Sequence, residues 1–240
     1  MKYAELQEPC KSAIEKGLCL GCVGLAEENW HENKDCIYAR VPKAAESIEQ
    51  IKINLGASNH SEKERETNDY YATDPKALKI FLDKLTKDNI QLHKNIWEPA
   101  CGEGHLSKLL EEEGYKVISS DLIDRGFGTP NINFLKTDKK WKGDILTNPP
   151  YQYAQEFVEH SLDILENGYY CIMFLKIQFL EGKARLEMFR KYPLKYIYVN
   201  SARQLCAMNG DFEKYKAMAI CYCWYIWEKG FTGNPEIRWI

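Results

Sequence analysis

The stretch Asn95–His105 reads Asn-Ile-Trp-Glu-Pro-Ala-Cys-Gly-Glu-Gly-His: a short strand pattern, two closely spaced glycines, and the start of a helical pattern. Leu106, Leu109 and Leu110 then repeat at helical spacing, so the expected order is strand, tight loop, helix. Two glycines separated by one residue let the backbone turn sharply and approach a ligand closely. The stretch therefore predicts the first strand–helix turn of an α/β sheet, the place where doubly wound sheets bind nucleotides.

The same alternation of strand and helix patterns continues through the rest of this region. Asp74-Pro75 predicts a helix start, because a capping side chain is followed by proline at the first helical position. Further strands are expected over 116–120, 144–146, 169–175 and 195–199, and further helices around 157–165 and over 185–192. This alternation predicts a Rossmann-like α/β sheet with helices on both faces. We expect the apolar run 216–227 to pair with 237–240 as a final hairpin that adds antiparallel strands at one edge.

Composition allows one such domain together with a small module, since the chain has 240 residues and a 45% hydrophobic fraction. The net charge of -3 means that no global basic field indicates nucleic-acid binding, although local patches can act in the same way. No apolar run approaches the roughly 20 residues that a membrane span needs. The first residues lack the apolar region of a signal peptide. We therefore expect an intracellular protein with no membrane partner, whose nine cysteines are reduced or bound to metal.

Residues 1–55 form a separate module in this interpretation, because they contain too few large apolar side chains to fold on burial alone. Their four cysteines include a Cys-x-x-Cys pair, and the four are Cys10, Cys19, Cys22 and Cys36. Four thiolates in a core-poor module favour a closed, tetrahedral structural Zn²⁺ site. An iron–sulfur cluster or unliganded core cysteines are the alternatives. The polar, charged residues 56–68 are interpreted as a linker to the α/β domain over 69–240.

Two carboxylates accompany the glycine loop. Glu98 directly precedes Pro99, where an acid would repel a pyrophosphate and suit a cationic ligand. Asp121 ends the second strand about 20 residues later, where a carboxylate can accept hydrogen bonds from two ribose hydroxyls. The expected ligand is adenosine-like, positively charged and free of phosphate, which describes S-adenosylmethionine. An ordinary turn and a solvated loop acid are the alternative interpretations of the loop and of Asp121.

A second motif, Thr147-Asn148-Pro149-Pro150-Tyr151, follows the apolar strand pattern over 144–146. The side-chain oxygen of Asn148 can bind an amino group, and prolines lack an N–H, so their carbonyls can only accept hydrogen bonds. Tyr151 offers a flat face for stacking. We interpret the motif as a grip on a planar molecule bearing –NH2, such as a nucleobase, whose two N–H groups bind Asn148 and the Pro149 carbonyl. A rigid loop with an exposed ring is the alternative.

In this order, the motifs resemble those of the amino-methyltransferase branch of class I S-adenosylmethionine-dependent enzymes, closest to small phage-type DNA N6-adenine methyltransferases. The resemblance covers about residues 69–240. It implies methyl transfer to an exocyclic amine, with double-stranded DNA as the partner and the target base flipped out. The catalytic residues that it implies are Asn148, Pro149, Pro150 and Tyr151. The cofactor-binding residues that it implies are Tyr71, Thr73, Glu98, Pro99, Ala100, Cys101, Gly102, Gly104, Asp121, Leu122, Asn133, Phe134 and Asn148.

Asn133 departs from the family pattern, which usually has Asp at this position; an amide oxygen can still accept a hydrogen bond from the cofactor's adenine amine. Alternative activities are methylation of cytosine N4, of adenine in RNA, or of a protein glutamine at N5, and a non-catalytic nucleic-acid-binding module is a further alternative. The basic, aromatic-rich stretch 183–198 favours nucleic acid over protein. The resemblance also implies the cytoplasm of a bacterial or phage-infected cell. No oligomeric state is predicted.

Overall fold

The computed structural model describes residues 70–204, 206–208 and 220–240. The predicted four-cysteine site (Cys10, Cys19, Cys22 and Cys36) and the predicted linker 56–68 lie outside the described residues. Within the described ranges, no helix is long and apolar enough to cross a membrane. Over the same ranges, no three His, Cys, Asp or Glu side chains are grouped as a metal ion would require.

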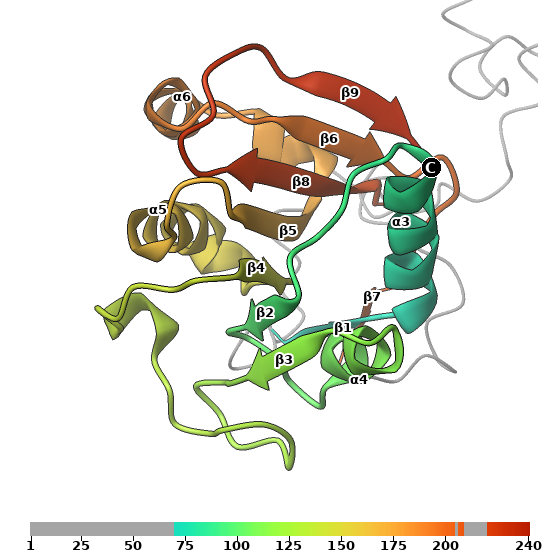
Figure 1. Cartoon of the computed structure of the whole chain (residues 1–240), viewed down its shortest axis with the longest axis vertical. Coiled ribbons are helices and arrows are strands. Elements are labelled where there is room, and N and C mark those ends of the chain that lie inside the picture. Colours follow the sequence, from blue (N-terminus) through green and yellow to red (C-terminus); the bar gives the residue numbers. More distant parts are fainter. Residues whose placement is uncertain (1–69, 205, 209–219) are drawn as a thin grey trace, which may run out of the picture. The chain divides into compact units, whose positions relative to one another are not determined.

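Seven strands of the described residues form one sheet in the order β3-β2-β4-β5-β8-β6-β9 (Figure 1). The strands are β2 (Asn95–Glu98), β3 (Lys116–Ser119), β4 (Asp144–Thr147), β5 (Tyr170–Lys176), β6 (Tyr196–Val199), β8 (Tyr222–Glu228) and β9 (Glu236–Trp239). The pairs β2–β3, β2–β4 and β4–β5 are parallel, as the sequence predicts. Because β3 lies on one side of β2 and β4 on the other, the direction of the strand order changes between β2 and β4.

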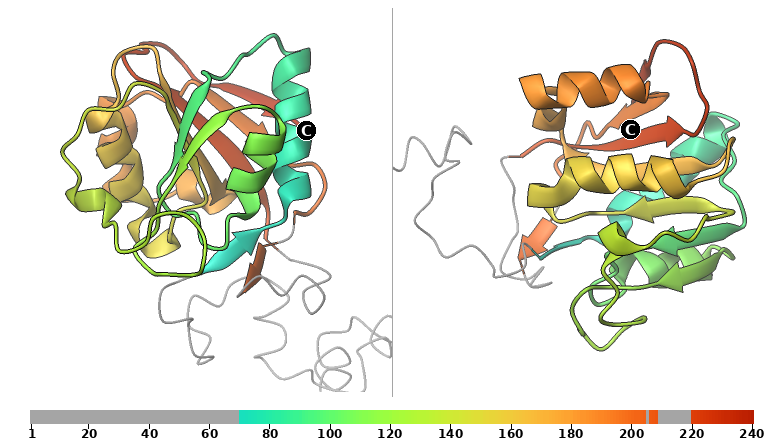
Figure 2. Two further views of the ribbon diagram at one scale, coloured as in Figure 1. Left: turned by 60° about the horizontal axis from the view of Figure 1, so that its bottom comes forward. Right: turned by 90° about the vertical axis from the view of Figure 1, so that its left-hand side faces the viewer.

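Helices cover both faces of this sheet, which confirms the predicted Rossmann-like α/β architecture (Figures 1 and 2). The helices are α3 (Pro75–Lys87), α4 (His105–Glu112), α5 (Ala154–Ile164) and α6 (Lys183–Lys191), with short 3₁₀ turns η3 (Phe134–Lys136), η4 (Tyr151–Tyr153) and η5 (Ile177–Leu180). The predicted start of α3 is confirmed, since the Asp74 carboxylate accepts a hydrogen bond from the Lys76 N–H at 2.9 Å. Helices α3 and α4 pack on one face, and α5 and α6 on the other.

The predicted C-terminal hairpin is wrong. Strand β8 lies between β5 and β6 and is antiparallel to both, while β9 pairs in parallel with β6. Residues Tyr222–Trp227 of β8 are all buried. A strand that buries both faces belongs in the interior of a sheet, so this apolar run takes a central position and leaves the edge to β9.

A second, two-stranded sheet was not predicted. It pairs β1 (Tyr71–Thr73) with β7 (Cys206–Met208) in antiparallel register, with Thr73 opposite Cys206. Strands of three residues are too short to show the alternating pattern by which a strand is recognised in sequence. This sheet matters for the site, because it places Tyr71 beside the residue that follows β4.

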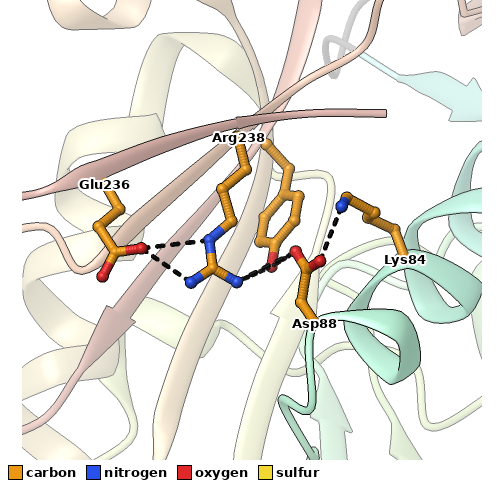
Figure 3. A network of polar contacts seen from close by, with 5 residues as sticks. Lys84, Asp88, Glu236 and Arg238 are labelled. Atoms are coloured by element: carbon orange, nitrogen blue, oxygen red, sulfur yellow. Dashed lines mark hydrogen bonds and ion pairs between the residues drawn. The ribbon is translucent and has the colours of Figure 1, made fainter.

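An ionic network joins the end of α3 to the last strand of the large sheet (Figure 3). Arg238 Nη1 donates to Asp88 Oδ2 at 3.0 Å, and Lys84 Nζ donates to Asp88 Oδ1 at 2.7 Å. The Tyr198 hydroxyl donates to Asp88 Oδ2 at 2.8 Å. Burial raises the pKa of the Asp88 carboxyl, but these three hydrogen bonds outweigh that effect and hold the pKa at about 2. The network therefore requires an ionised Asp88.

Candidate active site

A cavity of about 550 Å³ opens at the carboxyl ends of β2, β3 and β4. Ligands of open α/β sheets bind outside the carboxyl ends of the strands, where the strand order changes direction. The cavity brings together nearly all the predicted site residues, and those lining it are Tyr71, Thr73, Glu98, Pro99, Ala100, Cys101, Asp121, Leu122, Asn133, Phe134, Asn148, Pro149, Pro150 and Tyr151. Gly102 and Gly104 are not among the lining residues; they shape the loop that forms one wall.

The backbone of this loop requires glycine at both positions. Gly102 has φ +55° and Gly104 has φ +81°, values that side-chain-bearing residues rarely adopt. A Cβ at Gly102 would lie 2.4 Å from the Tyr70 ring, and one at Gly104 would lie 2.4 Å from the Phe127 ring. The loop is therefore held in a tight turn against two aromatic rings, and the predicted approach of its backbone to a ligand stays a prediction.

Asp121 connects the end of β3 to the glycine loop. Its Oδ2 accepts from the Gly102 N–H at 2.8 Å, and its Oδ1 accepts from the Ile123 N–H at 2.9 Å. Each carboxylate oxygen can accept more than one hydrogen bond. Asp121 can thus orient the loop and still bind the two hydroxyls of a ribose, the role predicted for it.

Glu98 lies at the base of the cavity and is 2% exposed. Its carboxyl accepts a hydrogen bond from the Ser107 hydroxyl. Burial, together with the nearby Asp121, raises the pKa of Glu98 to about 8, although hydrogen bonds from Ser107 lower it. Near pH 7 the carboxyl is therefore mostly neutral, and a cation beside it would favour ionisation. The predicted preference for a cationic ligand is thus linked to the release of a proton.

Asn133 and Phe134 also line the cavity. Asn133 Oδ1 accepts from the Leu135 N–H at 3.1 Å and so caps η3, while the remaining lone pair of the oxygen can accept from a ligand amine. Phe134 is 2% exposed and packs edge-on against Trp97, with ring centroids 5.2 Å apart. Phe134 therefore belongs mainly to the core and borders the cavity.

Asn148 presents an unsatisfied acceptor. Its Nδ2 donates to the Tyr71 carbonyl at 2.7 Å, whereas its Oδ1 is buried and has no hydrogen-bond partner within the described structure. Because a backbone carbonyl can only accept, this contact assigns the amide nitrogen to the Tyr71 side and the oxygen to the other side. A buried polar atom without a partner costs about 1–3 kcal/mol. An incoming N–H donor would remove that cost.

The two prolines that follow differ in their surroundings. Pro149 is buried and Pro150 is half-buried. The Pro150 carbonyl accepts from the Tyr153 N–H at 2.9 Å and starts η4, so it is engaged within the chain. The role of the Pro149 carbonyl as a second acceptor for an amine stays a prediction.

Tyr151 contacts several side chains that the sequence does not predict. Its ring stacks on Tyr71 and Tyr222, at centroid distances of 5.8 and 6.3 Å, and its hydroxyl donates to the Tyr222 oxygen at 3.1 Å. Lys176 Nζ lies 4.5 Å from the ring centroid. Burial raises the pKa of the Tyr151 phenol well above its usual value. Sequence reasoning missed Tyr222 and Lys176, which stand opposite each other in the β5–β8 pair and carry no local motif.

No protein-family model and no curated protein sequence matches this chain. Among solved structures, the chain is similar to an inferred RNA methyltransferase from Pyrococcus horikoshii, with a TM-score of 0.51 and 15% identity over 77% of this chain and 100% of that one. It is also similar to the methyltransferase subunit of the type I restriction-modification system from Streptococcus thermophilus, with a TM-score of 0.51 and 12% identity over 73% of this chain.

A third similar structure is a modification subunit of an inferred type I restriction enzyme from Vibrio vulnificus, with a TM-score of 0.50 and 12% identity over 80% of this chain. The chain spans 48% of the Streptococcus subunit and 50% of the Vibrio subunit. At these identities the likeness concerns the fold. The described part of the chain therefore shares the mixed α/β, Rossmann-like fold of these structures.

Proposed function

We propose that the chain is an S-adenosylmethionine-dependent methyltransferase that acts on the exocyclic N6 amine of adenine in DNA. The observation that carries this proposal is the buried, unpartnered Asn148 Oδ1 at the end of β4, whose orientation is set by the Tyr71 carbonyl. This acceptor lines the same cavity as the glycine loop and Asp121. A chain that only bound nucleic acid would need no such acceptor beside a cofactor pocket.

The residues present fit the cofactor. Glu98, the loop of Gly102 and Gly104, Asp121 and Asn133 would hold S-adenosylmethionine, which supplies an electrophilic methyl group when bound. Glu98 can become a carboxylate beside a positive charge by releasing its proton. Asp121 can accept hydrogen bonds from a pair of hydroxyls while it binds the Gly102 N–H. The tight glycine turn leaves room for the Tyr70 and Phe127 rings and so fixes the shape of the loop beside the cavity.

The acceptor residues act by orientation. The lone pair of an aromatic amine is delocalised into the ring, so the amine is a poor nucleophile. Asn148 Oδ1 and the Pro149 carbonyl would accept its two N–H groups, favour a tetrahedral nitrogen, and direct the lone pair to the cofactor side of the cavity. This is positioning and electrostatic stabilisation in a pre-formed site, and it requires no strong base. The surplus proton leaves the nitrogen after transfer.

Two kinds of support favour a base in DNA. The order of motifs resembles that of N6-adenine methyltransferases, and two of the similar structures are restriction-modification subunits. In this proposal the target base is flipped out of double-stranded DNA and stacks on Tyr151. The similarity to an inferred RNA methyltransferase, which the chain covers over its whole length, makes adenine in RNA the second candidate substrate.

The activity can be tested directly with the full chain. The protein is incubated with S-adenosylmethionine labelled in its methyl group and, separately, with unmethylated genomic DNA, total RNA and lysate protein. The products are digested and identified by mass spectrometry. We expect label in N6-methyladenine from DNA. Label in N4-methylcytosine or in RNA would change the substrate, and label only in glutamine of protein would overturn the nucleic-acid proposal.

The N-terminal cysteines hold a structural Zn²⁺ in this proposal. Metal analysis of the full chain should find about one zinc per chain, the number that a single four-thiolate site requires. Replacing Cys19 and Cys22 together with serine should remove it. Iron in place of zinc would indicate a cluster, and a metal-free protein would contradict the site.

A further inference from the structure

The order of the strands separates the two sides of the proposed reaction. The residues suited to the cofactor follow β2 and β3, on one flank of β4, and β5 lies on the other flank. In a methyl transfer the attacking nitrogen, the methyl carbon and the sulfur are close to one line, so donor and acceptor lie on opposite sides of the methyl group. The acceptor therefore approaches Asn148 from the β5 flank.

Lys176 occupies that flank. It is the last residue of β5, and its Nζ lies 4.5 Å from the centroid of the Tyr151 ring. A cation within about 6 Å of a ring centroid is attracted by the electrons of the ring face. Lys176 is not among the residues that line the cofactor cavity, whereas Tyr151 is. A base cannot stack on that ring face while the ammonium stays in place.

We propose that Lys176 covers the acceptor-side face of Tyr151 until a polynucleotide arrives, gives up that face to the target base, and then pairs with a phosphate next to the base. No covalent bond changes in this exchange. The inference rests on the proposed function and deepens it, because it makes Lys176 a positioning residue that selects the class of substrate.

The selection follows from charge. A nucleotide brings its own phosphate, so the ammonium that leaves the ring finds an anion on the same substrate. A glutamine side chain of a protein also has a planar –NH2 group, but it brings no anion with which the ammonium could pair. The exchange therefore favours polynucleotides, and it adds one phosphate contact to their binding.

Charge and shape at this position can be separated with two substitutions. Lys176→Met keeps an unbranched apolar side chain and removes the charge, whereas Lys176→Arg keeps a cation that can lie over a ring. Lys229→Met is a matched control, because Lys229 also lies over a tyrosine ring, that of Tyr192 at 5.9 Å. Lys229 directly follows β8, at the opposite end of the β5–β8 pair from Lys176. Thermal unfolding and the Kd for S-adenosylmethionine verify that each variant is folded and binds cofactor.

The measurement is the KM for unmethylated genomic DNA as a function of NaCl concentration. One phosphate contact contributes a slope of about 0.9 in a plot of log KM against log salt for duplex DNA. We expect Lys176→Met to lower that slope by about this amount and to raise KM at low salt. Lys176→Arg and Lys229→Met should keep the wild-type slope.

The outcomes separate this inference from the proposed function. If the wild-type chain methylates DNA but Lys176→Met keeps the wild-type slope, Lys176 contacts no phosphate and the inference is overturned. An equal loss in Lys176→Arg or in Lys229→Met would also overturn it, since the effect would then not depend on a charge at this position. If the wild-type chain labels only protein, the proposed function itself fails, whatever the variants do.

Discussion

The two flanks of β4 are built in different ways. On the cofactor flank, a carboxylate at the end of one strand binds the backbone of the neighbouring loop, as Asp121 does with Gly102, 19 residues away. On the acceptor flank, Asn148 is oriented by Tyr71, 77 residues away, and Tyr151 binds Tyr222, 71 residues away. The cofactor flank thus depends on backbone shape in two adjacent loops. The acceptor flank depends on side chains that only the completed fold brings together.

The largest effect is expected on the acceptor flank. Asn148→Ala removes the unpartnered acceptor, and we expect kcat to fall by at least about 10²–10³-fold, the usual loss when one electrostatic partner of the reacting group is removed. The Kd for S-adenosylmethionine, measured by calorimetry, should change little, because the glycine loop and Asp121 are untouched. Unchanged turnover would disprove the role of Asn148.

A matched variant tests the orientation of this amide. Asn148→Asp keeps the shape of the side chain but places a carboxylate oxygen against the Tyr71 carbonyl, 2.7 Å from the present nitrogen position. Two acceptors repel each other, so the side chain should rotate away and activity should again be lost. If Asn148→Asp retains wild-type activity, the contact with Tyr71 does not position the amide.

The next largest effect is expected on the cofactor flank. Gly104→Ala places a Cβ 2.4 Å from the Phe127 ring and also occupies φ +81°. Gly168→Ala has the same backbone problem at φ +90°, but nothing lies within 4 Å of its Cβ. Both should lose about 1–2 kcal/mol in urea unfolding from the left-handed backbone. Only Gly104→Ala should also weaken S-adenosylmethionine binding; equal binding losses would show that the clash is irrelevant.

A substitution remote from both flanks of β4 provides a reference that affects stability and not cofactor binding. Arg238→Ala removes a hydrogen bond to the Asp88 carboxylate and should lower the free energy of unfolding by about 1.5 kcal/mol, the lower end for hydrogen bonds to charged groups. Arg190→Ala should change stability far less. The side chains of its ion pair, Arg190 and Glu187, are 65% and 75% exposed. Neither should alter cofactor affinity.

The same network predicts the direction of a pH effect. The pKa of Asp88 is about 2 in the folded chain against an ordinary 3.8, so its stabilising contribution is present above pH 4 and is lost as the pH falls towards 2. Arg238→Ala should therefore flatten the acid limb of the stability profile. An unchanged acid limb would contradict the network.

A pH dependence of cofactor binding is also expected. Because Glu98 has a pKa of about 8, its carboxyl must release a proton before a cationic ligand can pair with the carboxylate. S-adenosylmethionine affinity should thus rise with pH, by at most about tenfold per unit, up to pH 8. Glu98→Gln should abolish this dependence. A wild-type Kd that is constant between pH 6 and 8 would contradict the linkage.

Glu98 also affects the stability of the ligand-free chain. Its folded pKa of about 8 lies above the ordinary 4.5, so the folded chain holds the proton more tightly than the unfolded chain does. The contribution of Glu98 to stability is fully present below pH 4.5 and is lost as the pH rises towards 8. Thermal unfolding of the wild type should therefore show a decline over this range that Glu98→Gln lacks.

The sequence by itself determined the elements of the large sheet and the cofactor flank. A capping Asp74 before Pro75, the turn of Gly102 and Gly104, and Asp121 at a strand end each act through nearby backbone, so their meaning is local. Such signals are readable because strand, turn and cap preferences depend on a few neighbouring residues. From these signals the sequence predicts helices on both faces of the sheet and the ligand-binding loops at one edge.

Only the tertiary structure decided the rest. Because β8 is buried on both faces, it lies in the interior of the sheet and not at the predicted edge. The pairing of β1 with β7 places the Tyr71 carbonyl within hydrogen-bond distance of Asn148. The motif from Asn148 to Tyr151 is local, but which amide atom is presented and which cation covers the Tyr151 ring depend on partners distant in sequence. Long-range pairing is set by the burial energy of the whole core, and no short stretch of residues encodes it.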